Sequence, residues 1–301
     1  MTNLKQFAGI ITALITPFDR EGQVEHKALG KLIRFQLNSG VDGFFTCGTA
    51  GSGVIMKADQ RKEVSEAVVV EVKGKVPVIV NVGAPDTETS VELAIHAEKV
   101  GADALACVTP YFYDFDQEAL VNHYVRVTKS VDLPVFLYNL PKRTGINLSV
   151  ELVTRIQKAA RNIVGIKDSS RDFAHLLEFL EKFPKEFIVI NGSDSYIFPA
   201  LTMGSRGAIS GYANPFPEVY VQLFEAYRRK EYSRAVELQF RINRVRRILS
   251  QTPIAPLHEA LAARGIDAGT VRSPLRPLTK TESREMTQQL RQIDFFTAAK
   301  G

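Results

Sequence analysis

The chain has 301 residues, of which 45% are hydrophobic and 24% are charged, the composition of an ordinary globular protein. This length allows one large domain or two small ones, with a core that needs no disulfide or metal to stabilise it. No apolar run approaches the roughly 18–20 residues needed to cross a bilayer, and the first residues lack a signal-peptide pattern. We therefore expect a cytoplasmic protein without a membrane segment.

The charge is only mildly basic, because 38 Lys and Arg against 33 Asp and Glu give a net charge of +5. Residues 241–247 hold four arginines, but binding to nucleic acid would need basic residues gathered into a stripe. We interpret this segment as a solvated helix face or a subunit contact. Cys47 and Cys107 are too few for a disulfide framework and lie in apolar segments, so we expect both to be buried, reduced and unreactive.

Short apolar segments rich in Val, Ile and Phe alternate with longer amphipathic segments along the whole chain. The short segments are hydrophobic at consecutive positions, which is typical of parallel strands that are covered on both faces. The predicted strands are residues 10–15, 43–46, 77–81, 104–108, 134–138, 163–167, 187–191 and 207–210.

The longer segments have the spacing of helices. Residues 86–100, for example, begin with Asp-Thr-Glu-Thr, which suits a helix N-terminus, and are followed by Gly101, which suits a helix end. The predicted helices that follow the strands are residues 25–38, 58–72, 86–100, 116–129, 149–160, 171–182, 194–203 and 217–229. Three further helices are predicted over residues 233–249, 256–263 and 280–296.

Eight strand–helix units in series predict an α/β fold of the closed (β/α)8 type, a TIM barrel. An open, doubly wound sheet is the alternative, but it usually has fewer strands and a glycine-rich first crossover, which residues 16–19 lack. We expect residues 1–230 to form the barrel. Residues 231–301 are expected to form a C-terminal helical extension that packs on the barrel within the same domain.

Two reactive residues lie at neighbouring strand ends, where the active sites of such barrels form. Tyr138 ends the fifth predicted strand and Lys167 ends the sixth. Burial of Lys167 would favour the neutral amine, a nucleophile that can form a Schiff base with a carbonyl substrate, and Tyr138 could transfer the proton. The alternative is a structural ion pair of Lys167 with Asp168 or Asp194.

The glycine-rich loop 48–53 follows the second predicted strand, and its backbone N–H groups could bind a carboxylate. It lacks the order of a dinucleotide motif and the Lys of a P-loop, so a tight turn is the alternative. Arg143 follows Tyr138 closely and could bind a second carboxylate through both guanidinium nitrogens, or be solvated. The five histidines show no metal-ligand spacing, and we therefore predict no metal.

Six short motifs occur in order along the chain. They are residues 13–18 (ALITPF), 48–51 (GTAG), 109–113 (TPYFY), 138–141 (YNLP), 165–168 (GIKD) and 207–210 (GAIS). Together they resemble the dihydrodipicolinate synthase/N-acetylneuraminate lyase family, the pyruvate-dependent class I aldolases and lyases. The resemblance extends from about residue 9 to at least residue 214, and it implies a covalent lysine imine with pyruvate and no separate cofactor.

The resemblance also implies residue roles. Lys167 matches the Schiff-base lysine, Tyr138 the general acid/base, and Thr49 the hydroxyl that links tyrosines in a proton relay. The residues that would hold pyruvate are Gly48, Ala50, Gly51 and, through its carbonyl, Ile209. Family members are commonly homotetramers in which an aromatic residue after the Thr-Pro motif reaches the neighbouring site.

The chain departs from the family pattern at two places. Ala50 and Ser52 replace a hydroxyl residue and an acid of the loop, which removes a hydrogen bond worth about 1 kcal/mol. The neighbour-reaching tyrosine corresponds to Phe112, which carries no proton, so Tyr111 or Tyr113 would have to substitute.

These residues lead us to expect a Schiff-base lyase or aldolase that condenses pyruvate with an aldehyde or releases it from the adduct. Arg143 favours aspartate semialdehyde as the partner, whereas Ala50 and Phe112 weaken it and leave the aldehyde of a 2-keto-3-deoxy sugar acid open. A non-catalytic TIM barrel that binds a small carboxylate is the alternative. In either case we expect small-molecule partners and neither nucleic acid nor membrane.

Overall fold

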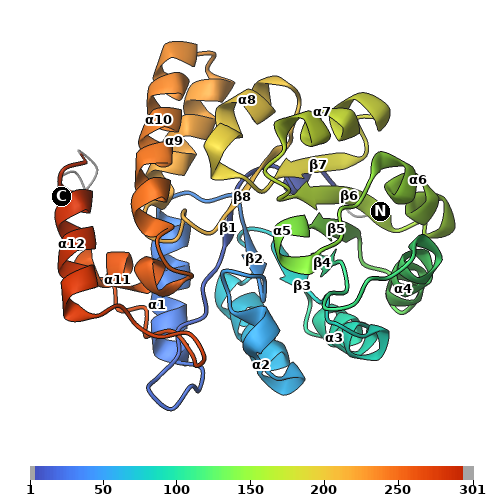
Figure 1. Cartoon of the computed structure of the whole chain (residues 1–301), viewed down its shortest axis with the longest axis horizontal. Coiled ribbons are helices and arrows are strands. Elements are labelled where there is room, and N and C mark those ends of the chain that lie inside the picture. Colours follow the sequence, from blue (N-terminus) through green and yellow to red (C-terminus); the bar gives the residue numbers. More distant parts are fainter. Residues whose placement is uncertain (1–3, 294–301) are drawn as a thin grey trace.

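The protein is a closed barrel of eight parallel strands surrounded by helices, as seen in a computed structural model that describes residues 4–293 (Figure 1). The strands pair in chain order, and β8 pairs with β1 to close the barrel. They are β1 (Gly9–Ala13), β2 (Gly43–Thr46), β3 (Val78–Asn81), β4 (Ala104–Val108), β5 (Val135–Asn139), β6 (Ile163–Asp168), β7 (Ile188–Asn191) and β8 (Gly207–Ser210). The predicted (β/α)8 fold is confirmed, and no strand end differs from its predicted position by more than two residues.

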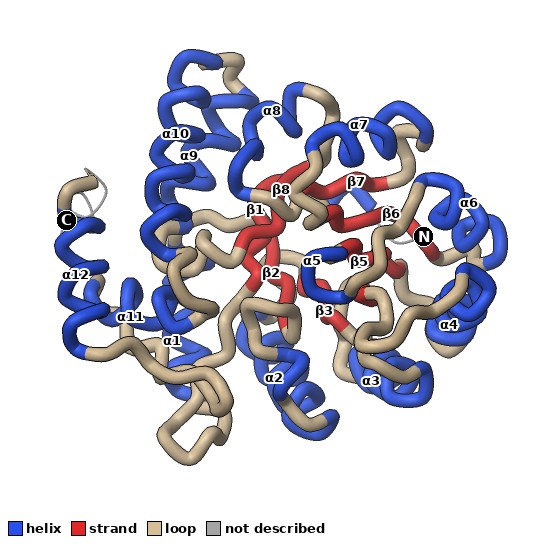
Figure 2. The backbone as a smooth tube through the Cα atoms, viewed as in Figure 1, coloured by secondary structure: helices blue, strands red, loops and turns tan. Residues whose placement is uncertain are grey.

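The helices form the outer layer around the ring of strands (Figure 2). The helices that connect or follow the eight strands are α1 (His26–Asn38), α2 (Ala58–Val72), α3 (Thr87–Lys99), α4 (Gln117–Lys129), α5 (Pro141–Thr144), α6 (Val150–Ala159), α7 (Phe173–Lys182), α8 (Ile197–Thr202) and α9 (Pro217–Arg228). Many begin where a side chain accepts a hydrogen bond from the first turn, as Asp86 does from the Thr89 N–H and Ser149 from that of Leu152. None of the helices within residues 4–293 is long and apolar enough to cross a membrane.

Two helical segments differ from the prediction. α5 is a single turn that the periodicity did not reveal, because four residues are too few to show a helical repeat. The helix predicted over 194–203 is divided into a 3-10 turn (Asp194–Tyr196) and α8. Pro199 explains the division, because its ring clashes with the carbonyl group four residues earlier in a continuous helix.

The core has two layers, which explains why the strands are apolar at consecutive positions. One set of strand side chains, including Ile11, Phe45, Phe136 and Ile190, fills the inside of the barrel. Phe7, from the segment before β1, packs edge-on against Phe136 at 5.4 Å between ring centroids. The other strand side chains face the helices and form the larger outer cluster.

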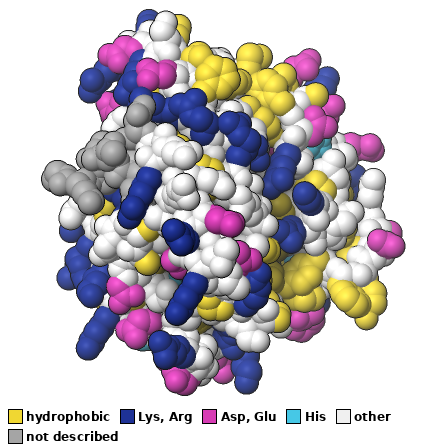
Figure 3. All heavy atoms as spheres, turned by 60° about the vertical axis from the view of Figure 1, so that its left-hand side comes forward, with side chains coloured by type: hydrophobic (Ala, Val, Ile, Leu, Met, Phe, Trp, Pro, Cys, Tyr) yellow, Lys and Arg dark blue, Asp and Glu magenta, His cyan; other side chains and the backbone are white. Residues whose placement is uncertain are grey.

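The C-terminal part of the chain is helical and lies on one side of the barrel (Figure 1). Its helices are α10 (Tyr232–Leu249), α11 (Ala255–Ala263) and α12 (Lys280–Arg291). α10 packs along α9, and α12 packs on α10 and α11. The last helix was predicted to continue to residue 296, but it ends at Arg291, and residues 294–296 lie outside the described residues. Figure 3, which faces this side, shows Lys and Arg side chains at many separate places with Asp and Glu between them.

Candidate active site

The carboxyl ends of the strands surround a cavity of about 720 Å³. This is the end of the barrel at which the sequence predicted the site. Tyr138, Lys167 and Thr49 all line the cavity. Its outer wall comes from the C-terminal part of the chain: Arg246, Leu249, Ser250, Gln251, Thr252, Pro253, Ile254, Leu257, Pro274 and Leu275.

Lys167 is buried at the end of β6, with 3% of its surface exposed. Its Nζ lies 3.8 Å from the ring centroid of Phe45 and 4.1 Å from that of Tyr138. Burial lowers the pKa of Lys167 to about 7, and the charge of Asp194 opposes this shift only in part. Near neutral pH a large fraction of this amine is therefore uncharged and able to act as a nucleophile.

The alternative ion pair of Lys167 with Asp168 or Asp194 is not formed. Asp168 instead accepts hydrogen bonds from Asn139 Nδ2 at 2.8 Å and from Ser170 Oγ at 2.7 Å. Asp194 accepts one from the Tyr220 hydroxyl at 2.8 Å and another from Ser210. Within the described chain Lys167 has no hydrogen bond or ion pair of its own, which leaves its amine available to a ligand.

Tyr138 is placed beside Lys167 by strand pairing, because the two residues are register partners on β5 and β6. Its hydroxyl lies 3.3 Å from Thr49 Oγ1, and its ring packs edge-on against Phe45 at 5.5 Å. Burial raises the pKa of Tyr138, while the hydrogen bond with Thr49 opposes the rise. The phenol is therefore protonated at neutral pH and can donate a proton to a ligand bound at Lys167.

The loop after β2 is tightly folded because two of its glycines leave no room for a side chain. A Cβ atom would lie 2.8 Å from the Leu14 carbonyl oxygen at Gly51 and 1.9 Å from the Cys47 carbonyl oxygen at Gly53. The backbone N–H groups of Ala50 and Gly51 form no hydrogen bond within the described residues. A carboxylate bound near Lys167 could therefore accept hydrogen bonds from these N–H groups.

The other predicted substrate residues are distributed unevenly around the cavity. Thr49, Ala50, Arg143, Ile209 and Tyr111 line it, whereas Gly48 and Gly51 belong to the same loop without lining it. Phe112 does not line it: this residue has a φ of 88°, and 86% of its surface is exposed. Tyr113 is also exposed, at 68%.

Several residues of the cavity wall were missed by the sequence analysis, among them Arg171, Tyr212 and Arg246. Segment 241–247 was interpreted as a solvated face or a subunit contact, and the structure adds that Arg246 of this segment lines the cavity. A signal was present, since Arg246 follows the buried Ile242 by four residues and so lies on the apolar face of α10. Arg171 and Tyr212 had a weaker signal: both lie in loops just after a strand, the end of the barrel at which such sites form, but nothing in the sequence distinguishes them from other residues of these loops.

The two cysteines are free and buried, as predicted. Cys107 Sγ lies 3.5 Å from His123 Nε2, and burial raises the pKa of this thiol to about 12. Among residues 4–293, no group of three or more His, Cys, Asp or Glu side chains is arranged to hold a metal ion.

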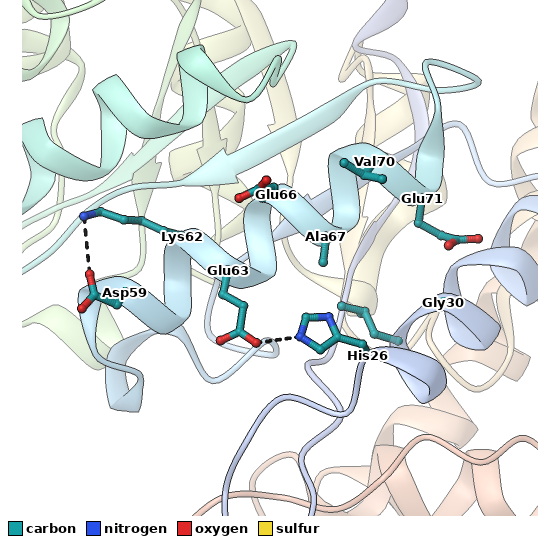
Figure 4. Close-up of a pocket in the computed structure, with 10 residues that line it drawn as sticks. His26, Gly30, Asp59, Lys62, Glu63, Glu66, Ala67, Val70 and Glu71 are labelled. Atoms are coloured by element: carbon teal, nitrogen blue, oxygen red, sulfur yellow. Dashed lines mark hydrogen bonds and ion pairs between the residues drawn. The ribbon is translucent and has the colours of Figure 1, made fainter.

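A second cavity, of about 620 Å³, lies outside the barrel between α1 and α2 (Figure 4). Figure 4 shows His26 of α1 pointing toward Glu63 of α2, and their side chains are 2.6 Å apart. None of the predicted site residues lines this cavity. The reactive residues of the chain are therefore gathered in the barrel mouth.

Comparisons with known protein sequences agree with this geometry. The profile of the Dihydrodipicolinate synthetase family matches residues 6–293. An uncharacterized DapA-like lyase of Halobacterium salinarum is 40% identical over 271 residues, which cover 90% of this chain and 88% of that protein. The 4-hydroxy-tetrahydrodipicolinate synthase of Bacillus subtilis is 33% identical over 288 residues, covering 95% of this chain and 99% of that protein.

Solved structures give the same result. YagE, a prophage protein of the dihydrodipicolinic acid synthase family from E. coli K12, in complex with pyruvate, matches with a TM-score of 0.93 at 29% identity, covering 96% of this chain and 99% of YagE. CdNal from Clostridium difficile, in complex with mannosamine, matches with a TM-score of 0.91 at 29% identity, covering 95% and 99%. Since the family profile spans nearly the whole chain and relatives exceed 30% identity over most of it, the chain belongs to the dihydrodipicolinate synthetase family.

Proposed function

We propose that this protein is a pyruvate-dependent Schiff-base lyase of the aldolase type. The neutral Nζ of Lys167 attacks C2 of pyruvate, and loss of water gives an iminium ion. This ion draws electrons from C3, so that a proton leaves C3 and an enamine forms. C3 then attacks the carbonyl carbon of an aldehyde to form the C–C bond, and water releases the product from Lys167. The reverse sequence cleaves the same bond.

The observation that supports this proposal is the position of an unpaired amine, with a pKa of about 7, beside a protonated phenol. Lys167 and Tyr138 share one wall of the cavity, and the Lys167 amine lies 4.1 Å from the Tyr138 ring centroid. Each proton transfer in the scheme needs a group within reach of the bound carbonyl. Tyr138 supplies this group, and Thr49 Oγ1 at 3.3 Å accepts or donates the proton in turn.

The remaining site residues orient the substrates in this proposal. The N–H groups of Ala50 and Gly51 bind the carboxylate of pyruvate, with the carbonyl of Ile209 on the opposite side of the cavity. Arg143 binds the aldehyde partner, which is aspartate semialdehyde or the aldehyde of a 2-keto-3-deoxy sugar acid. The lysine imine replaces any separate cofactor or metal.

The proposal includes a cytoplasmic homotetramer. Phe112 and Tyr113 project from the loop after β4, and their rings pack edge-on at 5.2 Å. Two neighbouring aromatic side chains this exposed are typical of a surface that a second subunit covers. Tyr111 of the same loop already faces the cavity of its own subunit.

Trapping the imine tests this function. The enzyme is incubated with pyruvate and sodium borohydride, which reduces an imine to a stable amine, and the modified peptide is identified by mass. Lys142 is the matched control, because it lines the same cavity but is exposed. We expect the label on Lys167 in the wild type and in Lys142→Met, and none in Lys167→Met. A label on another lysine, or no label in the wild type, would contradict the proposal.

A further inference from the structure

The outer half of the cavity is strongly cationic. Arg143 of α5, Arg171 of the loop after β6 and Arg246 of α10 all line it. Among the residues that line the cavity, Asp194 is the sole carboxylate, and Tyr220 and Ser210 already donate hydrogen bonds to it. The positive charge of the wall is therefore not neutralised by the lining residues themselves.

The three arginines have no hydrogen bond or ion pair through their side chains within residues 4–293. Some other arginines of the chain are paired with carboxylates. Arg264 pairs with Glu218 and Arg276 with Glu282, each with an N–O distance of 2.7 Å. A guanidinium group carries five donors, and several unpaired guanidinium groups around one cavity are suited to an anionic ligand.

Arg171 is held in a conformation that would favour glycine. Its φ is 66°, in the left-handed region, and it is the central residue of a turn in which the Asp172 N–H donates to Ser170 Oγ at 3.1 Å. A residue with a side chain is strained here, and strain of this kind is concentrated at functional sites. The strained backbone places a long cationic side chain at the cavity where glycine would leave open space.

Arg246 reaches the cavity from the C-terminal helices. Its Nε atom is shielded from solvent and has no hydrogen-bond partner. Its charge acts on two groups of the cavity wall, since it lowers the pKa of Asp194 and that of Tyr212 against the effect of burial. Arg246 therefore brings a positive charge to the cavity wall, which it lines.

Tyr212, in the loop after β8, lines the same cavity as the three arginines. Burial raises the pKa of its phenol and the charge of Asp194 adds to the rise, whereas Arg171, Arg246 and Arg143 oppose it. The phenol offers a further donor to a ligand at the same place.

We propose that Arg171, Arg246 and Tyr212, which line one cavity, form a subsite for an anionic group at the end of the aldehyde that is remote from its carbonyl. The inference rests on the proposed function, in which Lys167 binds pyruvate at the floor of the cavity. The anionic group is a carboxylate or a phosphate, since guanidinium groups bind both through paired hydrogen bonds. Arg143 is closer to Tyr138 in the sequence than Arg171 and Arg246 are. We assign it to the part of the aldehyde that is nearer the carbonyl group.

The preference of the enzyme for anionic over neutral aldehydes is measured with matched aldehydes in the presence of pyruvate. Glyceraldehyde 3-phosphate is compared with glyceraldehyde, and succinic semialdehyde with butanal, by following product formation. We expect the ratio of kcat/KM for the anionic over the neutral aldehyde to fall about 10- to 100-fold in Arg171→Gly and in Arg246→Gln, the effect of losing a charged hydrogen bond. Tyr212→Phe should lower it less. A larger fall in the ratio for the glyceraldehyde pair indicates that the subsite binds phosphate, and a larger fall for the succinic semialdehyde pair indicates that it binds carboxylate.

Arg247→Gln is the control, because Arg247 is the exposed neighbour of Arg246 on α10 and does not line the cavity. It should leave the ratio unchanged. Glycine adopts a φ of 66° readily, so Arg171→Gly should fold normally, and circular dichroism of each variant checks this. An unchanged ratio in both Arg171→Gly and Arg246→Gln would overturn the subsite.

A binding measurement separates this inference from the proposed function. Inorganic phosphate and succinate are titrated into the enzyme without pyruvate, and the heat of binding is recorded for the wild type and the three variants. Weaker binding in Arg171→Gly and Arg246→Gln, but not in Arg247→Gln, supports the subsite even if borohydride labels no lysine. Labelling of Lys167 combined with equal binding in all variants would leave the function standing and overturn the subsite.

Discussion

The reactivity of Lys167 follows from the balance of burial against its neighbours. Two aromatic rings near Nζ and the charge of Asp194 favour the protonated form, but burial outweighs them. The pKa falls from 10.5 to about 7, a difference on the order of 5 kcal/mol between the two protonation states. Removing the amine from water is therefore what prepares it for attack on a carbonyl.

The rate of imine formation should follow the neutral fraction of Lys167. We expect the single-turnover rate with pyruvate to rise with pH through about 7 and to level off above about 8, where about nine tenths of the amine is neutral. Borohydride trapping at a series of pH values measures this rate. A rate that still rises tenfold per pH unit near about pH 9 would show that the pKa of Lys167 is not lowered.

The same shift predicts that Lys167 lowers the stability of the fold. Between about pH 7 and 10.5 the unfolded chain binds more protons at this residue than the folded chain, so stability rises with pH over this range. Lys167→Met, which fills similar space without a charge, should raise the free energy of unfolding by a few kcal/mol at pH 7 and below. The gain should disappear as the pH approaches 10.5, whereas Lys142→Met should change little at any pH. Denaturant titrations at several pH values measure both.

Tyr138 and Thr49 should contribute unequally to catalysis. Tyr138→Phe keeps the ring that packs against Phe45 but loses the proton, so kcat should fall about 10²- to 10⁴-fold. Thr49→Val removes only a hydrogen-bond partner at 3.3 Å, and a loss of about 10-fold is expected. Steady-state kinetics with circular dichroism as a folding control test both variants. Equal losses in the two would contradict the assignment of Tyr138 as the direct proton donor.

At the scale of elements, one buried asparagine connects the strand ends where the barrel closes. Asn214 lies after β8, and its Nδ2 donates to the Ala13 carbonyl at 2.8 Å, while its Oδ1 accepts from the Ile15 N–H at 3.1 Å. Its own carbonyl oxygen accepts from Gln36 Nε2 at 2.6 Å, which connects α1 to the same point. These bonds hold the chain after β1, which borders the active-site cavity.

Asn214→Ala should therefore be strongly destabilising. The change leaves the Ile15 N–H and the Ala13 carbonyl buried without these partners, at about 1–3 kcal/mol for each unsatisfied group. We expect a loss of about 3 kcal/mol in the free energy of unfolding, measured by denaturant titration. Asn122→Ala, on the exposed face of α4, is the matched control and should be neutral or slightly stabilising. A similar stability for the two variants would show that Asn214 does not hold the barrel closure.

At the scale of the whole molecule, the site is completed by a part of the chain far from the barrel strands in sequence. The segment from Arg246 to Ile254 and the Pro274–Leu275 bend form the outer wall of the cavity. The barrel strands supply Lys167 and Tyr138, and the C-terminal part of the chain supplies the outer wall of the cavity. This division explains how substrate choice can change while Lys167 and Tyr138 stay in place.

The exposed aromatic loop predicts the oligomeric state. We expect light scattering to give four times the 33.4 kDa mass of one chain. The double variant Phe112→Ser, Tyr113→Ser removes the exposed rings, and we expect it to dissociate at lower protein concentrations than the wild type. Val70→Ser, an exposed apolar residue of α2, serves as a control that should leave the association unchanged. A monomeric wild type would contradict the prediction.

The sequence by itself determined the barrel and indicated Tyr138 and Lys167 as the candidate reactive pair, which the structure brings to one cavity. Buried parallel strands are apolar at consecutive positions, and this local pattern recurs eight times, so the strands were predicted to within two residues. Once the fold class is known, the rule that sites lie at the carboxyl ends of strands leads to Tyr138 and Lys167 without coordinates.

Only the tertiary structure decided what surrounds that pair. Arg171 and Arg246 are far apart in sequence and line one cavity because α10 packs along α9, so that its C-terminal end borders the cavity. No local sequence pattern predicts that these two residues line the same cavity. An arginine in a loop and an arginine on a helix are each expected to be solvated until the positions of the neighbouring residues are known. The lowered pKa of Lys167 likewise depends on burial by residues from several strands, which is a property of the packed molecule.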